Sequence, residues 1–185
     1  VFTYHGVCFW DDKYSDDEAH ERLVTALHHT IGDLITSVGD VKDVVMTIQP
    51  SDDCFHSGML EEIQTLFKNT DYQAMGYTKG YIMSYQTKEV REYNPDTNPP
   101  FFSIKFPKEV FIDPFKHLKY TGPYKSHEYV VDYLKYLPIE RRGFLVGTHG
   151  ENISTHFNIP YAGSTWNDTI PGFEWLDLVQ PLNIR

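Results

Sequence analysis

The stretch that decides the fold is Val44-Val45-Met46-Thr47-Ile48-Gln49-Pro50-Ser51-Asp52-Asp53-Cys54-Phe55. Its first five residues are apolar or β-branched and predict a buried strand. Residues 50–53 predict a tight turn, and the two residues after them predict the start of a return strand. We therefore expect a β-hairpin that carries two neighbouring carboxylates at its tip.

The paired carboxylates suggest a metal site. Two neighbouring carboxylates at a hairpin tip repel each other, so each makes ionisation of the other less favourable. A divalent cation removes that cost, and hard oxygen ligands suit Mg²⁺ or Mn²⁺. We therefore expect Asp52 and Asp53 to hold a metal at the edge of a nucleotidyl-transfer site. The plainer interpretation is an ordinary turn, because Asp and Ser side chains hydrogen-bond the local backbone.

Composition limits the function classes. At 185 residues the chain can bury one good core, with or without a smaller appendage. Its net charge of -10 argues against an autonomous nucleic-acid binder that is held by basic residues. Any basic surface that contacts RNA would come from the rest of a larger polypeptide or from partner subunits. The sequence predicts neither a signal peptide nor a membrane-spanning run.

Hydrophobic spacing predicts an α+β (α/β) fold. Predicted helices cover residues 17–38, 59–68 and 126–137, the third between an N-cap serine and a proline. Predicted strands or extended segments cover residues 2–10, 72–77, 79–85, 87–93, 101–106 and 110–112. The turn-rich stretch 94–100 marks a boundary. We therefore expect one unit over residues 1–95 and a second over 96–185.

This order of elements is that of a polymerase palm from its middle onward. Two motifs make the likeness specific: Ser51-Asp52-Asp53 after an apolar strand, and Lys79-Gly80-Tyr81-Ile82 followed by Thr87-Lys88-Glu89-Val90. They resemble the third palm motif, and the fourth and fifth, of the catalytic subunit of the RNA-dependent RNA polymerase of influenza-like, segmented negative-strand RNA viruses. Further similarities follow in the family's order at Arg142-Gly143-Phe144-Leu145-Val146, Gly150, Asn152, Ile159-Pro160, Trp175 and Pro181-Leu182-Asn183.

The resemblance implies a partial palm followed by a thumb-like segment, and template-directed nucleotidyl transfer by two metal ions. It implies that Asp52 binds Mg²⁺ or Mn²⁺ directly and that Asp53 supports or shares this binding. Lys79 would stabilise or protonate the pyrophosphate leaving group, and Ser51 and Glu89 would contact the nucleotide or primer end. The implied partners are viral RNA, nucleoside triphosphates, and the cap-binding and endonuclease subunits, in the virion and the nucleus of an infected cell, with no membrane.

The chain departs from this family at its beginning. The first metal-binding aspartate of the family is not identified. Asp12 and Asp17 have the spacing of that motif, but they lie too close to the predicted hairpin to leave room for the motif between them. We therefore expect a fragment that is inactive by itself. Lys79 and Glu89 can also be read as ordinary surface residues.

Two other interpretations stay open. Gly122-Pro123-Tyr124 with the predicted helix after it resembles the ligand-binding module of bacterial regulators that bind small cationic molecules. Such a module is not an enzyme, and a buried glutamate among aromatic walls would mark it. In the other interpretation, Cys8 and Cys54 pair in a secreted domain.

Overall fold

A computed structural model describes residues 39–50, 52–121, 127–150, 152, 155–158 and 165–166, together with four residues between 18 and 26. Several predicted features lie outside the described residues. These are the strand over 2–10, most of the helix over 17–38, Ser51, Cys8, Gly122-Pro123-Tyr124 and the segment from residue 167 onward. Among the described residues, no helix is long and apolar enough to cross a bilayer.

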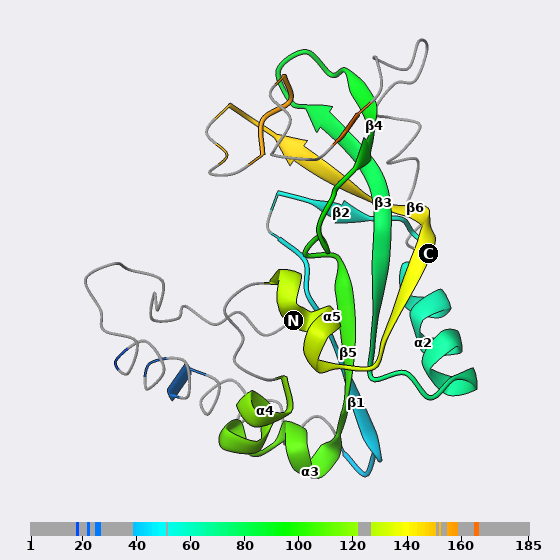
Figure 1. The fold of residues 1–185 in the computed structure, drawn as a ribbon, viewed down its shortest axis with the longest axis vertical. Coiled ribbons are helices and arrows are strands. Elements are labelled where there is room, and N and C mark those ends of the chain that lie inside the picture. Colours follow the sequence, from blue (N-terminus) through cyan, green and yellow to red (C-terminus); the bar gives the residue numbers. More distant parts are fainter. Residues whose placement is uncertain are drawn as a thin grey trace. The chain divides into compact units, whose positions relative to one another are not determined.

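The described chain is a mixed α+β structure with a curled sheet and few helices (Figure 1), which confirms the predicted fold class at this level. The strands are β1 (Asp43–Thr47), β2 (Cys54–Phe55), β3 (Ala74–Ser84), β4 (Val90–Asn94), β5 (Phe102–Pro107), β6 (Tyr136–Thr148) and β7 (Thr165–Trp166). The helices are α2 (Met59–Asn69), α3 (Lys108–Phe111), α4 (Pro114–Thr121), α5 (Val130–Tyr133) and the short 3₁₀ helix η1 (His127–Tyr129).

Strand β3 is the centre of the sheet. Its first residues pair with β5 and its last ones with β4, both antiparallel, while β6 runs parallel to it along the other edge. The β3–β6 register shifts between Tyr77 and Gly80. The sequence predicted two strands, over 72–77 and 79–85, where the structure has one continuous strand with an irregular pairing at that point. Its residues are buried over most of its length, and Met75, Tyr77 and Ile82 belong to a hydrophobic core that includes the buried face of α2.

The predicted hairpin is wrong. Strand β1 neighbours β5, and the ladder continues in a hydrogen bond from Ile48 N–H to the Phe102 carbonyl at 3.0 Å. Strand β2 instead pairs with β6, with Phe55 opposite Phe144. This long-range pairing places the Phe55 ring edge-on against Phe101, at a centroid distance of 5.4 Å. Burial of that ring favours β6 as the partner over the strand next to it in sequence.

Two further predictions fail after β5. The segment 110–112, predicted as extended chain, lies in α3 and the turn after it. The helix predicted over 126–137 ends at Tyr133, and Pro138, predicted to stop it, lies inside β6. By contrast, α2 and β5 match their predicted ranges within one residue at each end.

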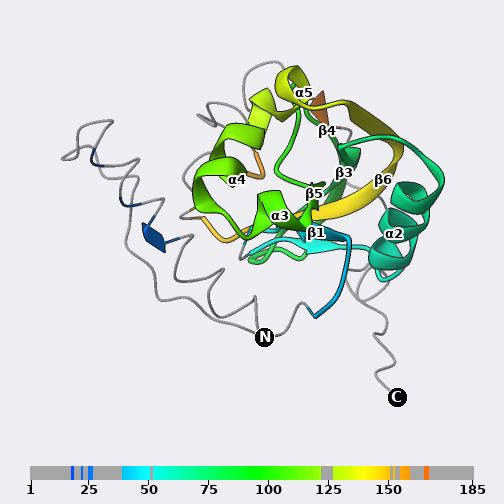
Figure 2. The same cartoon turned by 90° about the horizontal axis from the view of Figure 1, so that it is seen from below.

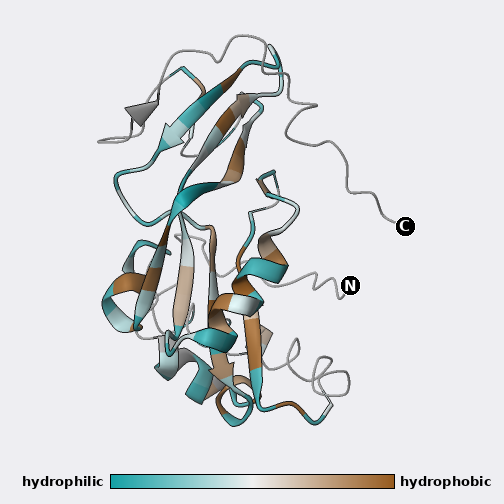
Figure 3. Cartoon of the chain, turned by 90° about the vertical axis from the view of Figure 1, so that its right-hand side faces the viewer, coloured by the Kyte–Doolittle hydropathy of each residue, from teal (hydrophilic) through white to brown (hydrophobic). Residues whose placement is uncertain are grey.

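The core packs α2 against the sheet. Met59, Ile63 and Phe67 form the buried face of the helix. The rings of Phe101 and Phe144 stack within this core, 4.0 Å apart and nearly parallel. Helix α2 lies beside β6 in two views (Figures 1 and 2), and it carries hydrophobic and hydrophilic residues along its length (Figure 3). This amphipathic helix therefore forms one wall of the unit that carries the candidate site.

The chain divides into two compact units, and each is built from two separate stretches of sequence. The predicted division into residues 1–95 and 96–185 stays a prediction. One unit comprises Val1–Met46 and Lys105–Lys125, and the other comprises Thr47–Ile104 and Ser126–Arg185. In the first unit, the buried His117 ring stacks on Phe106 at 4.3 Å. The second unit contains Asp52, Asp53 and every residue that contacts them below.

Candidate carboxylate site

Asp53 is a buried carboxylate, with 8% of its surface exposed. Its Oδ1 atom accepts a hydrogen bond of 2.9 Å from the backbone N–H of Gly147, in β6. Loss of hydration raises the pKa of Asp53 to about 6, and the neighbouring Asp52 adds to this rise, while the Gly147 hydrogen bond opposes it. Asp53 is therefore held inward, against the end of a distant strand.

Asp52 is the accessible member of the pair, with 31% of its side chain exposed. Its Oδ2 atom accepts a 2.8 Å hydrogen bond from the side-chain amide of Asn152 and lies 3.5 Å from Nε2 of His149. The backbone carbonyl of Asp52 accepts a hydrogen bond from the Tyr85 hydroxyl at 3.1 Å. The two adjacent carboxylates thus have separate partners, and only Asp52 faces solvent.

Gly147 allows the turn to approach the sheet. A Cβ atom at this position would lie 2.3 Å from the Asp52 carbonyl oxygen and 2.5 Å from the Tyr85 ring. Tyr85 is placed by its own N–H, which donates to the Thr148 carbonyl at 2.8 Å, just past the paired residues Met83 and Gly147. The end of the parallel β3–β6 ladder therefore holds the Asp52–Asp53 turn in position.

These residues do not fit a complete Mg²⁺ or Mn²⁺ site. Asp53 directs one oxygen to a backbone N–H in a buried position, and Asp52 has one of its two oxygens bonded to Asn152. Within the described part of the chain, no three His, Cys, Asp or Glu side chains gather as metal ligands would. Mg²⁺ takes an octahedral set of oxygen ligands. Asp52 alone can offer an accessible carboxylate oxygen here.

Lys79 is not brought to this turn. Its ammonium pairs with Glu140 at 3.2 Å, and 43% of its side chain is exposed. On β3 it lies four residues before Met83, which pairs with Gly147, so it is about 13 Å along the strand from the turn at ~3.3 Å per residue. The structure therefore does not place Lys79 beside the two carboxylates, and its role toward a leaving group stays a prediction.

Glu89 lies in the turn between β3 and β4, and it is exposed. Its carboxylate accepts a hydrogen bond from the Thr87 hydroxyl at 2.9 Å, and its carbonyl accepts one from the N–H of Ser84 at 3.0 Å. The Thr87-Lys88-Glu89 segment thus closes a β-hairpin, with Lys88 in the left-handed region at a φ of 63°. Ser51 lies outside the described residues.

Sequence reasoning assigned no role at this turn to Tyr85, His149 or Asn152. The signal that could have pointed to the loop is its composition. Gly150 and Asn152 follow a strand whose last residues are buried, a pattern typical of a tight loop after the strand. Which strand end this loop meets is not encoded in any local pattern, because 94 residues separate Asp53 from Gly147.

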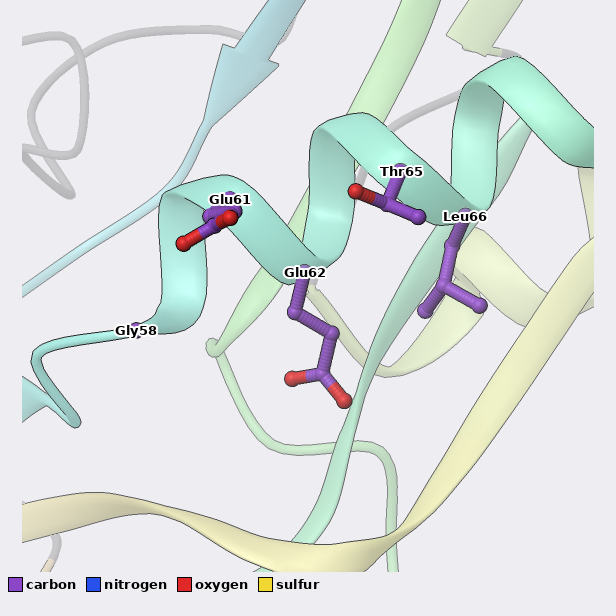
Figure 4. A pocket seen from close by; sticks show the side chains of 5 residues that line it. All are labelled: Gly58, Glu61, Glu62, Thr65 and Leu66. Carbon is purple, nitrogen blue, oxygen red and sulfur yellow. The ribbon is translucent and has the colours of Figure 1, made fainter.

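A second polar cluster joins α2 to the sheet. The Glu62 carboxylate accepts hydrogen bonds from the Arg141 guanidinium and the Tyr77 hydroxyl, and it lies 3.4 Å from His56. Burial would raise the pKa of Glu62, but the bonds from Arg141 and Tyr77 outweigh it and lower this pKa. An open depression of about 290 Å³ lies beside the cluster, lined by Gly58, Glu61, Glu62, Thr65 and Leu66 (Figure 4).

Figure 4 shows the side chains of Glu62 and Leu66 on one side of α2 and that of Glu61 directed elsewhere. Glu62 is already neutralised by Arg141, so it does not offer a free charge to a ligand in this depression. We therefore regard the cluster as a tie between α2 and β6.

Comparison with protein-family models, curated proteins and solved structures gives no significant match for this chain.

Proposed function

We propose that this chain is part of a viral RNA-dependent RNA polymerase and that the Asp52–Asp53 turn is its contribution to the nucleotidyl-transfer centre. The observation that carries the proposal is the accessible carboxylate of Asp52, which a turn after an apolar strand presents to solvent while its neighbour Asp53 is buried. In a polymerase, a carboxylate in this place binds metal ions that act on the primer hydroxyl and the triphosphate.

The order of elements supports the proposal. A strand, the Asp-Asp turn, the amphipathic helix α2, and the antiparallel pair β3 and β4 follow one another in the order of the quoted motifs, although β1 and β2 do not pair with each other as the expected hairpin would. The segments that resemble the fourth and fifth palm motifs lie at the hairpin of β3 and β4, with Ile82 opposite Arg91. Both segments therefore belong to one local unit, as a palm would need.

The number of accessible carboxylates limits the chemistry that we assign to the chain. Nucleotidyl transfer needs carboxylates from more than one element around the ions. Because the described residues supply one accessible carboxylate and not a full set, we assign no reaction step to a metal here. Asp52 is assigned as the contacting carboxylate, Asp53 as its buried support, and Lys79 as a secondary candidate that would have to move to reach a triphosphate.

The alternative of a small-molecule-binding module is less well supported. A module of that kind needs a buried glutamate that is free to bind a cation. Glu62 lies against the aromatic residues Tyr77 and His56, yet it is already paired with Arg141. The charge that would attract a cationic ligand is therefore compensated within the chain.

The test is RNA-templated incorporation of labelled nucleotide by the full polypeptide that contains this chain. We expect incorporation by the unmodified protein in Mg²⁺ or Mn²⁺ and its loss in Asp52→Asn. Asp43→Asn, at the start of β1, is a matched control that should retain activity, because Asp43 is exposed and belongs to the other compact unit. A polypeptide that incorporates no nucleotide on any template would contradict the proposal.

A further inference from the structure

Asn152 bridges the loop after β6 and the Asp52–Asp53 turn, and its amide is bonded in three directions. Nδ2 donates to Oδ2 of Asp52 at 2.8 Å and to the Gly147 carbonyl at 2.9 Å. Oδ1 accepts from the N–H of His149 at 2.7 Å. The amide is therefore fixed by two backbone groups of its own loop before it reaches the carboxylate 100 residues away in sequence.

This arrangement uses both halves of the carboxamide. Nδ2 carries two donor hydrogens and Oδ1 is an acceptor, so one asparagine can satisfy all three partners. An aspartate at this position would keep the acceptor but would lose both donors and add a like charge beside Asp52. An alanine would lose all three bonds.

The backbone of the loop after β6 places the Asn152 amide beside Asp52. Gly150 has a φ of 93°, in the left-handed region that favours glycine, and it lies between His149 and the side chain of Asn152 to which His149 donates. Gly147 lets the Asp52 backbone approach the strand end closely. The carboxylate of Asp52 thus has one oxygen held by the protein, while Oδ1 has no hydrogen-bond partner among the described residues.

We propose that Asn152 is a positioning residue that holds the Asp52 carboxylate in one rotamer and so presents its Oδ1 atom to the ligand. This inference deepens the proposed function and rests on it for the identity of the ligand, but the positioning itself is a property of the chain alone. A carboxylate that is held in one orientation loses less freedom when it binds. Loss of a group that orients a ligating side chain typically changes affinity or activity by about 10–100-fold.

The direct test is the χ1 rotamer of Asp52, measured by NMR three-bond couplings in the full polypeptide. We expect one dominant rotamer in the unmodified protein, and averaged couplings in both Asn152→Ala and Asn152→Asp. Asn98→Ala is the matched control, because Asn98 also donates its amide to a backbone carbonyl distant in sequence, that of His127, and makes no contact with the turn. Couplings of Asp52 that stay unchanged in both Asn152 variants would overturn the proposal.

The kinetics of nucleotide addition give a second test. In Asn152→Ala we expect kcat for nucleotide addition to fall by about 10–100-fold while KM for the nucleotide stays within about twofold. Unchanged kcat would overturn the inference that the held rotamer serves the chemistry. If the unmodified polypeptide adds no nucleotide, the proposed function fails, and the rotamer test still decides whether Asn152 positions Asp52.

Discussion

The Oδ1 atom of Asp53 accepts a hydrogen bond from the backbone N–H of Gly147, 94 residues away in sequence, at 2.9 Å in a buried position. This contact separates the two adjacent acids. Asp53 fastens the turn to the end of β6, while Asp52, bonded to Asn152 by one oxygen, remains accessible. The predictions below follow from this division between a buried and an accessible carboxylate.

The first prediction concerns pH. Burial raises the pKa of Asp53 from 3.8 to about 6. Between these two pH values, Asp53 is protonated in the folded state and ionised in the unfolded state. The stability from this group is fully present below pH 3.8 and is lost as pH rises through about 6, a change of roughly 3 kcal/mol at 1.36 kcal/mol per pKa unit.

Asp53→Asn removes this titration, and the amide oxygen can still accept from Gly147. Urea unfolding at several pH values should therefore show a decline in stability between about pH 4 and 6 that is reduced in Asp53→Asn. Asp43→Asn, an exposed control, should keep the decline of the unmodified chain. An identical pH profile for the unmodified chain and Asp53→Asn would show that Asp53 is not buried as described.

The second prediction concerns Gly147. A methyl group at this position would meet the Asp52 carbonyl and the Tyr85 ring, at 2.3 and 2.5 Å. The backbone carbonyl cannot move aside without loosening the turn. Gly147→Ala should therefore lower the free energy of unfolding by about 1–3 kcal/mol, measured by urea denaturation. A variant as stable as the unmodified protein would mean that the turn does not lie against β6.

The third prediction concerns the cluster that ties α2 to β6. Arg141→Met removes the two-pronged pairing with Glu62 and leaves a partly buried carboxylate without its cation. We expect a loss of about 1 kcal/mol in the free energy of unfolding, because both side chains remain partly exposed to solvent. Lys135→Met is the control, since its partner Asp71 is 99% exposed and its loss should cost less than about 0.5 kcal/mol. Equal effects of the two substitutions would argue against the tie.

The fourth prediction concerns Lys79. If this lysine serves the pyrophosphate leaving group, Lys79→Ala should lower kcat for nucleotide addition and leave KM for the nucleotide nearly unchanged. Lys68→Ala, at an exposed position in the last turn of α2, is the control for loss of one positive charge. Equal rates in Lys79→Ala and in the unmodified protein would assign Lys79 to its surface pair with Glu140.

Local sequence patterns predicted the range of α2 well, because Leu60, Ile63, Leu66 and Phe67 recur at helical spacing. Of these, Ile63 and Phe67 are buried together with Met59, whereas Leu60 is exposed. They also predicted β5 and the turn that carries Asp52. The hairpin was wrong because neighbouring strands with a turn between them are indistinguishable in sequence from two strands that pair elsewhere. The pairing of β2 with β6 places the half-buried Phe55 opposite the buried Phe144, and no local window contains both residues.

The candidate site was predicted in part for the same reason. Adjacent aspartates in a turn can be read directly from the sequence. The burial of Asp53 and the partner of Asp52 cannot, because Gly147 lies near the far end of β6 and Asn152 in the loop after it. The exposed pairing of Lys79 also depends on the register of β3 against β6, which places Glu140 within reach. Local reasoning therefore found the carboxylates and misjudged what surrounds them.

The most direct measurement compares nucleotide addition and unfolding in Asp52→Asn and Asp53→Asn of the full polypeptide. The account predicts that Asp52→Asn lowers kcat by more than about 100-fold, beyond the loss expected for an orienting residue, with little change in stability. Asp53→Asn should reduce kcat less and should change mainly how stability depends on pH. Near-normal nucleotide addition by Asp52→Asn would contradict the account.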